Sequence, residues 1–227
     1  MNNKRFAVIG GTIYDTDLGF SILKDLGINA IKKNIKNTPI QQEEFQLNHN
    51  IKHDINDHII VQINNLKNKY FISHVLIYCV SMSGLIDHTK ITNQTGVQLI
   101  TPYTSIYDKL KNFNKLGVLS ANNLSADNFE KHILKFNKNC NVSKMFNLNI
   151  VTDIEKKMHA SIIIKNYKLD IFLENLKKNK TNKLVLGCTH FSYLMNELSQ
   201  LNEIEIFDVK SFIINELESK YLYHDKV

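Results

Sequence analysis

Short apolar runs alternate with longer amphipathic stretches along almost the entire chain, and this alternation constrains the fold more than any other feature. Strands that are separated by helices form βαβ units, in which neighbouring strands run parallel. The pattern therefore predicts an α/β fold with mainly parallel sheets. The predicted strands are, in chain order, Phe6–Ile9, Val75–Cys79, Val97–Ile100, Leu116–Leu119, Val142–Phe146, Leu184–Leu186 and Ile204–Phe207.

The segments between these strands carry apolar residues every three to four positions, which is the period of an amphipathic helix. Side chains that commonly cap helix N-termini stand at Thr104-Ser105, Ser125, Asp153 and Asp208, so we expect helices to begin there. The predicted helices are Leu18–Leu26, Asn56–Lys69, Ser105–Phe113, Ser125–Phe136, Asp153–Asn166, Leu169–Lys178, Phe191–Leu201 and Phe212–Tyr221.

The number of predicted strands fits two small sheets better than one. A boundary near Thr101-Pro102 is expected, because the residue before a proline is disfavoured in a helix. Each half of the chain then contains one strand that ends at a cysteine, Cys79 in the first half and Cys188 in the second. This repetition predicts two similar domains related by a pseudo-twofold axis, with the two thiols facing each other across a cleft.

The formal net charge of the 227-residue chain is +6, but its lysines are scattered and Arg5 is the only arginine, so we expect no nucleic-acid partner. No apolar run reaches the roughly 18 residues that a membrane span needs, so we expect no membrane partner. The segment Met1–Phe6 is too short for a signal peptide, which predicts a cytoplasmic protein. Three cysteines without a C-x-x-C pair predict reduced thiols rather than a disulfide framework or a structural zinc site.

Cys79 and Cys188 each stand where an apolar strand ends and a new segment begins. The carboxyl ends of parallel strands are where α/β proteins bind their ligands. A cysteine at a helix N-terminus also has its thiolate favoured by the backbone N–H groups and the helix dipole. Cys140 lies in a polar run without such a setting, and we expect it to be non-catalytic.

Two facing thiols can invert a stereocentre that carries an acidic C–H bond. One thiolate removes the proton from one face, and the other thiol returns a proton to the opposite face, so no cofactor is needed. The ordinary thiol pKa of about 8.5 is close to working pH, as acid–base catalysis requires. The charge that develops on the substrate carboxylate needs hydrogen-bond donors, and Ser81 and Thr189 stand almost directly after the two cysteines.

With these features the sequence resembles the aspartate/glutamate racemase superfamily, whose members use two cysteines and no pyridoxal phosphate. The segment Leu186–Phe191 is similar to the second-cysteine motif of that superfamily, and the resemblance extends over nearly the whole chain. The other similar segments, which follow in the expected order, are Ala7–Gly11, Ile77–Ser81, Leu116–Ala121 with Phe129, and Glu205–Asp208.

The resemblance implies two similar α/β domains with the active site in the cleft between them. The last helix would return to the first domain, which gives residues 1–100 with 210–227 as one domain and residues 101–209 as the other. It also implies cofactor-independent racemisation of an amino acid, with aspartate or glutamate as the expected substrate, without a metal and in a homodimer. By position, Cys79 and Cys188 would be the acid/base pair, and Ser81 and Thr189 would bind the carboxylate. His190 would assist Cys188 or the substrate amine.

Two positions and the N-terminal turn, Gly11–Asp17, depart from the pattern of the superfamily. Val80 stands where the superfamily usually has an asparagine that binds substrate. Asn122 stands near the position where a threonine of the superfamily often helps to hold the substrate. The N-terminal turn contains Gly11 and Thr12, which we expect to bind substrate. It is followed by an acidic pair, Asp15 and Asp17, that could contact a substrate ammonium or activate Cys79. These departures leave the acid/base pair intact and leave the substrate side chain open.

Two other kinds of function stay open from the sequence. The chain could be another enzyme of the same superfamily, such as a maleate isomerase or a hydantoin racemase. Related decarboxylases dispense with one cysteine, so the presence of both favours racemisation. From a different class, it could be a non-catalytic amino-acid-binding relative, and Val80 is the feature that best supports this alternative.

Overall fold

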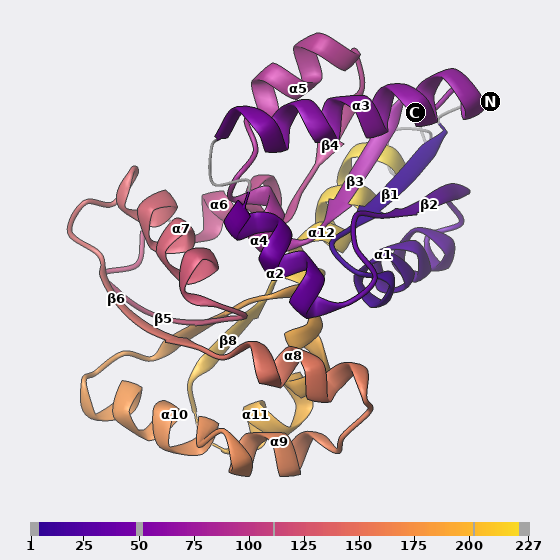
Figure 1. The fold of residues 1–227 in the computed structure, drawn as a ribbon. Helices are drawn as coiled ribbons and strands as arrows, with labels where there is room; N and C mark the ends of the chain where they lie inside the picture. Colours follow the sequence, from indigo (N-terminus) through magenta and orange to yellow (C-terminus); the bar gives the residue numbers. More distant parts are fainter. Residues whose placement is uncertain (1–4, 49–51, 111, 202, 223–227) are drawn as a thin grey trace. The chain divides into compact units, whose positions relative to one another are not determined.

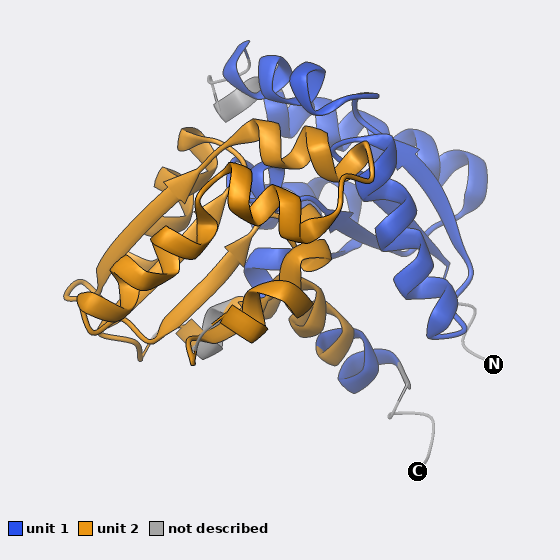
Figure 2. Cartoon of the chain, turned by 90° about the horizontal axis from the view of Figure 1, so that it is seen from below, with its two compact units in different colours: residues 1–104, 216–227 blue, residues 105–215 orange. Residues whose placement is uncertain are grey.

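Two four-stranded parallel sheets, each flanked by helices, form the framework of the chain (Figure 1). The computed structural model describes residues 5–48, 52–110, 112–201 and 203–222. The chain divides into two compact units, residues 1–104 with 216–227 and residues 105–215 (Figure 2). The predicted α/β fold with two small parallel sheets is thereby confirmed.

The sheet of the first unit has the strand order β2-β1-β3-β4. Its strands are β1 (Phe6–Gly10), β2 (Ala30–Asn34), β3 (His74–Tyr78) and β4 (Gln98–Ile100). The two central strands, β1 and β3, consist almost entirely of buried apolar residues, as expected for strands that are covered on both faces. Gly10 pairs with Tyr78, so the next residues, Gly11 and Cys79, leave the sheet at the same carboxyl edge.

Before β5 (Lys115–Ser120), the described part of the chain forms five helices within the first unit and a sixth that begins there and continues into the second unit. They are α1 (Ile13–Asp25), α2 (Pro39–Asn48), α3 (Lys52–Tyr70), α4 (Val80–Ser83), α5 (His88–Thr95) and α6 (Pro102–Leu110). Helix α1 lies directly on the sheet, because a side chain at Gly19 would come within 2.7 Å of Tyr78 Cβ and 2.8 Å of Val8 Cγ1. This close packing fixes the start of α1 next to the end of β1.

The sheet of the second unit has the order β6-β5-β7-β8, which repeats the order of the first unit strand for strand. Its strands are β5 (Lys115–Ser120), β6 (Asn141–Phe146), β7 (Lys183–Gly187) and β8 (Glu205–Asp208). Cys79 and Cys188 thus follow the third strand of their respective units. The helical segments that follow β5 in this unit are α7 (Asn123–Leu134), α8 (Leu148–Glu155), α9 (Ala160–Asn166), α10 (Leu169–Lys178), η1 (Thr189–Leu194), α11 (Met195–Leu201) and most of α12 (Val209–Leu217). The segment η2 (Glu218–Leu222) follows α12 and belongs to the first unit.

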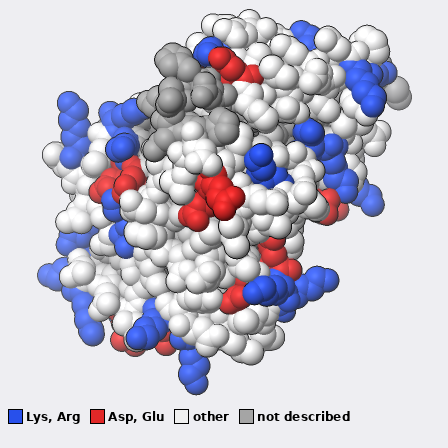
Figure 3. All heavy atoms as spheres, viewed as in Figure 1, with Lys and Arg blue, Asp and Glu red and all other residues white. Residues whose placement is uncertain are grey.

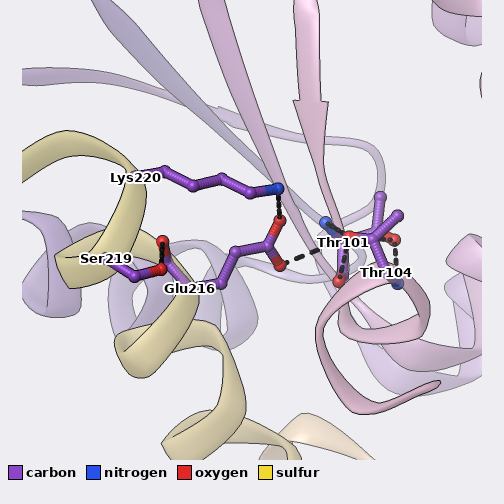
Figure 4. A network of polar contacts seen from close by, with 5 residues as sticks. All are labelled: Thr101, Thr104, Glu216, Ser219 and Lys220. Carbon is purple, nitrogen blue, oxygen red and sulfur yellow. Dashed lines mark hydrogen bonds and ion pairs between the residues drawn. The ribbon is translucent and has the colours of Figure 1, made fainter. Parts of the chain in front are cut away.

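The end of α12 and the residues after it belong to the first unit. Glu216 accepts hydrogen bonds from Thr104 Oγ1 at 3.5 Å and from Lys220 Nζ at 2.6 Å (Figure 4). The ring of Tyr221 packs edge-on against Phe6 and His74, with ring centroids 5.4 and 5.0 Å apart. These contacts tie the C-terminal segment to the first strand and the first half of the chain.

Several elements differ from the sequence prediction for local physical reasons. The predicted helix Asp153–Asn166 is two helices, α8 and α9, separated near Lys157, whose φ of 59° is incompatible with a continuous right-handed helix. The prediction missed strand β2, whose lysines suit a half-buried edge strand rather than an apolar run. Helices α2, α4 and α5 were also missed, since none of them carries a clear apolar period.

Some predicted helix caps are displaced. Asn122 rather than Ser125 caps α7, with Asn122 Oδ1 accepting from Ser125 N at 2.9 Å. Thr101 rather than Thr104 precedes α6, and Asp153 lies inside α8 instead of opening a helix. Asp208 does open α12 as predicted, because its Oδ1 accepts from Lys210 N at 3.0 Å.

The charged side chains visible in Figure 3 stand in small groups separated by uncharged surface, and acidic groups lie among the basic ones. Lys32 pairs with Asp17 and Lys90 pairs with Asp57, both at the surface. Within the described residues, none of the helices combines the length and the apolar character needed to cross a membrane.

Candidate active site

Gly11 brings the backbone at the end of β1 into contact with the first thiol. A Cβ atom at Gly11 would lie 2.8 Å from Cys79 Sγ and 3.1 Å from Asp15 Oδ2. Cys79 is 4% exposed and Asp15 is 3% exposed, so both groups lie in a buried site at the carboxyl edge of the first sheet. Because carboxylates are rarely buried without a task, Asp15 is a candidate proton acceptor or substrate contact beside the thiol.

The two acidic residues of the N-terminal turn have different surroundings. Asp17 is half-exposed and pairs with Lys32 Nζ at 2.8 Å, which makes it a surface residue. Asp15 instead faces the site from the first turn of α1, because Thr12 Oγ1 accepts from Asp15 N and fixes where the helix begins. Thr12 therefore acts as a helix cap as well as lying at the edge of the site.

Ser81 connects the first thiol to a helix that the sequence prediction missed. Its Oγ lies 3.4 Å from Cys79 Sγ and accepts a hydrogen bond from Gln46 Nε2 at 2.8 Å. Since the amide of Gln46 occupies a lone pair of the hydroxyl, the O–H of Ser81 can donate to the sulfur. Such a bond favours the thiolate form of Cys79.

In the second unit, Cys188 is the first member of a chain of three polar side chains. Cys188 Sγ lies 3.7 Å from His190 Nδ1, and His190 Nε2 lies 2.9 Å from Glu155 Oε1. A carboxylate accepts from Nε2–H and thereby leaves Nδ1 as the acceptor that faces the thiol. His190 is 2% exposed, so this arrangement lets the imidazole take the thiol proton inside a buried site.

The helical segments that follow the two thiols are short. Cys79 is followed by the four-residue helix α4, and Cys188 is followed by the 3-10 segment η1 instead of a continuous helix Phe191–Leu201. Short segments align few peptide dipoles, so the expected helix-dipole contribution to thiolate stability is small.

Further polar residues lie at the carboxyl edge of the second sheet. Ser120 pairs with Gly187, which brings the loop that contains Asn122 to the same edge as Cys188. The hydroxyl of Ser192 donates to Asp208 Oδ1 at 2.7 Å, and burial raises the pKa of the Asp208 carboxyl. Thr189 is 1% exposed at the start of η1, directly after the thiol.

The predicted site residues thus form two groups, one in each unit. Gly11, Thr12, Cys79 and Ser81 gather in the first, and Asn122, Cys188, Thr189 and His190 gather at one sheet edge in the second. Sequence reasoning missed Gln46 and Glu155. The described residues contain no group of three or more His, Cys, Asp or Glu side chains that could hold a metal ion.

Gly11→Ala is expected to lower activity on the order of 100-fold, because a methyl group 2.8 Å from Cys79 Sγ must displace the sulfur. The variant should also melt at a lower temperature than the wild type. Adding Cys79→Ala to it should recover that melting temperature, since the smaller side chain removes the collision. Full activity of Gly11→Ala would show that the sulfur has room to move without consequence.

No family model matches the chain. The glutamate racemase of Buchnera aphidicola subsp. Schizaphis graminum is 27% identical over 171 residues, which are 73% of this chain and 66% of that protein. The glutamate racemase of Shewanella denitrificans is 35% identical over 86 residues, which are 37% of this chain and 31% of that protein. The chain therefore aligns with less than two thirds of the length of either relative.

Solved structures extend the likeness to the whole chain. The glutamate racemase from Francisella tularensis, solved in complex with D-glutamate, superposes with a TM-score of 0.73 at 16% identity. The match covers 100% of this chain and 83% of that one. At this level of identity the comparison shows a shared fold.

Proposed function

We propose that the chain is a cofactor-independent amino-acid racemase of the aspartate/glutamate racemase superfamily, with Cys79 and Cys188 as its acid/base pair, because it is similar to glutamate racemases in sequence and in fold. Glutamate is the proposed substrate, since both curated relatives are glutamate racemases. The proposal includes a cytoplasmic homodimer, as the resemblance of the sequence implies.

One observation supports this proposal above the others. Two sheets of the same strand order each present a thiol directly after their third strand. Each sulfur has a polar partner that can exchange or stabilise a proton, Ser81 for Cys79 and His190 for Cys188. A structural role in packing alone would not require such a partner at both equivalent positions.

The proposed reaction transfers one proton at each sulfur. The thiolate of one cysteine takes the α-proton, so an S–H bond forms while the electron pair of the broken C–H bond stays on the substrate. The thiol of the other cysteine then gives its proton to the opposite face of the α-carbon and becomes a thiolate. The product has the inverted configuration, and the next reaction of that product runs with the two roles exchanged.

The two sulfurs would be served by different bases. Glu155 holds the imidazole of His190 with its acceptor nitrogen toward Cys188, so that imidazole can hold the proton of this thiol. In the first unit Asp15 and Cys79 both lie against Gly11, where the carboxylate can orient the thiol or the substrate ammonium. The reaction therefore does not depend on two equivalent thiols.

Hydrogen-bond donors must stabilise the negative charge that spreads onto the substrate carboxylate after proton removal. The proposed donors are the hydroxyls of Ser81 and Thr189, with the backbone turn at Gly11 and Thr12 and the amide of Asn122 as further contacts. Ser81 and Thr189 each stand within two residues of a sulfur. Each sulfur therefore has a hydroxyl donor close to it in the chain.

The proposal is tested by incubating the protein with L- and D-amino acids in deuterium oxide. Proton NMR should show loss of the α-proton signal, and chiral chromatography should show the opposite enantiomer. We expect glutamate to exchange fastest. Absence of exchange with every acidic, polar and basic amino acid would overturn the racemase assignment and favour a binding protein. Exchange or isomerisation confined to a hydantoin or to maleate would move the chain to another reaction of the superfamily.

A further inference from the structure

Gln42 is a buried side chain without an evident structural role. It is 5% exposed, and neither its Oε1 nor its Nε2 has a hydrogen-bond partner among the residues that the structure describes. The residue one turn later on the same face of α2, Gln46, uses its amide to hold Ser81. Helix α2 therefore carries two buried carboxamides, one engaged and one not.

The carboxamide of Gln42 lies at the first thiol. The Cβ position of an alanine at Gly11 would be 3.3 Å from Gln42 Cδ, 2.8 Å from Cys79 Sγ and 3.1 Å from Asp15 Oδ2. Three polar groups from three different elements thus converge on one point at the end of β1. Val80, the residue after the thiol, is apolar and 1% exposed, so it adds no polar side chain there.

An amide buried without partners is costly, because it has lost its hydrogen bonds to water and gained none in return. A leucine or methionine of similar size at this position would avoid that cost. Native structures contain few such groups, and each calls for an explanation. A ligand that supplies the missing hydrogen bonds explains why a polar residue stands here.

We propose that Gln42 is a substrate-binding residue whose carboxamide binds the α-carboxylate and α-ammonium groups of an amino acid at Cys79. This inference rests on the proposed racemase function and adds a contact to it. A carboxamide offers a donor and an acceptor side by side, and the α-groups of an amino acid offer an acceptor and a donor. The Nε2–H group also stabilises the charge that the carboxylate gains when the α-proton leaves.

Gln42→Met tests the proposal, because it keeps the length of the side chain and removes both polar atoms. The KM for glutamate is expected to rise roughly 10- to 100-fold, as for the loss of a hydrogen bond to a charged group. The unliganded variant should melt at the same temperature as the wild type or higher, since an unsatisfied polar group has been removed. A merely structural role for the amide would instead lower the melting temperature.

Gln41→Met is the matched control. Gln41 precedes Gln42 on the same helix, is exposed, and lines a hollow of about 430 Å³ with Glu44 and Asn48 on a different face of α2. Its KM should match that of the wild type. Gln42→Leu provides a second apolar variant, and it should reproduce both the higher KM and the unimpaired melting temperature of Gln42→Met.

Calorimetric titration with D- and L-glutamate separates this inference from the racemase proposal. If the wild type exchanges no α-proton but binds glutamate, and Gln42→Met binds it at least 10-fold more weakly, the role of Gln42 holds although the enzyme assignment fails. If the wild type racemises and Gln42→Met has an unchanged KM and affinity, the role of Gln42 is refuted and the enzyme assignment stands. A melting temperature that falls together with activity also refutes it.

Discussion

Cys79→Ala and Cys188→Ala should each abolish inversion, with a loss of roughly 10²- to 10⁴-fold or more, because each variant lacks one of the two proton-transfer groups. Each single variant should still exchange the α-proton of one enantiomer with solvent, since one thiol continues to serve one face. The retained enantiomer should differ between the two variants. Chiral chromatography measures inversion, and proton NMR in deuterium oxide measures exchange.

Cys140→Ala is the control for this pair. Cys140 is a buried cysteine that directly precedes β6, so it lies at the amino edge of the second sheet, whereas Cys188 follows β7 at the carboxyl edge. Its activity should equal that of the wild type. Retention of inversion in Cys79→Ala or Cys188→Ala would contradict the mechanism, as would exchange of the same enantiomer by both.

The second large effect is expected at the residues that orient Cys188. His190→Asn removes the imidazole and should lower the rate of racemisation by roughly 10²- to 10⁴-fold. Glu155→Gln removes the charge that stabilises the imidazole and should lower the rate by a smaller factor. The two enantiomers have equal free energy in solution, so kcat/KM must fall equally in both directions. The asymmetry appears instead in the primary deuterium isotope effects, which should rise most where Cys188 removes the proton.

Glu174→Gln makes the same change of charge at an exposed position of α10 and should leave both rates and isotope effects unaltered. The decisive comparison is between the isotope effects measured with L- and D-glutamate. If Glu155→Gln changed both to the same extent, or changed neither, the assignment of the His190–Glu155 pair to one thiol would be wrong.

Much of the fold could be predicted because its signals are local. The buried strands β1, β3, β5 and β7 are short apolar runs, and each was expected within a few residues of its observed bounds. The segment that became α8 and α9 has a continuous apolar period, and only the left-handed backbone at Lys157 divides it. Periodicity does not report such a turn, because Lys157 carries no composition signal of its own.

Helix α2 shows why part of the site was not predicted. Its sequence, Pro39–Asn48, is rich in glutamine and glutamate and contains few apolar residues, so no apolar periodicity predicts a helix there. The helix nevertheless supplies Gln46 to Ser81 and brings Gln42 against Gly11. Glu155 was missed for a related reason, since 35 residues separate it from His190 and no local motif joins them.

The sequence by itself determined the parallel α/β architecture and the positions of Cys79 and Cys188 at strand ends, because apolar runs and the residues that follow them are local properties. The tertiary structure decided which polar groups reach each sulfur. Those neighbours come from separate segments, which the order of the strands brings to one sheet edge. Asp15, Ser81 and Gln42 meet at Cys79, while His190 and Glu155 meet at Cys188, and these contacts give two similar thiols different chemical surroundings.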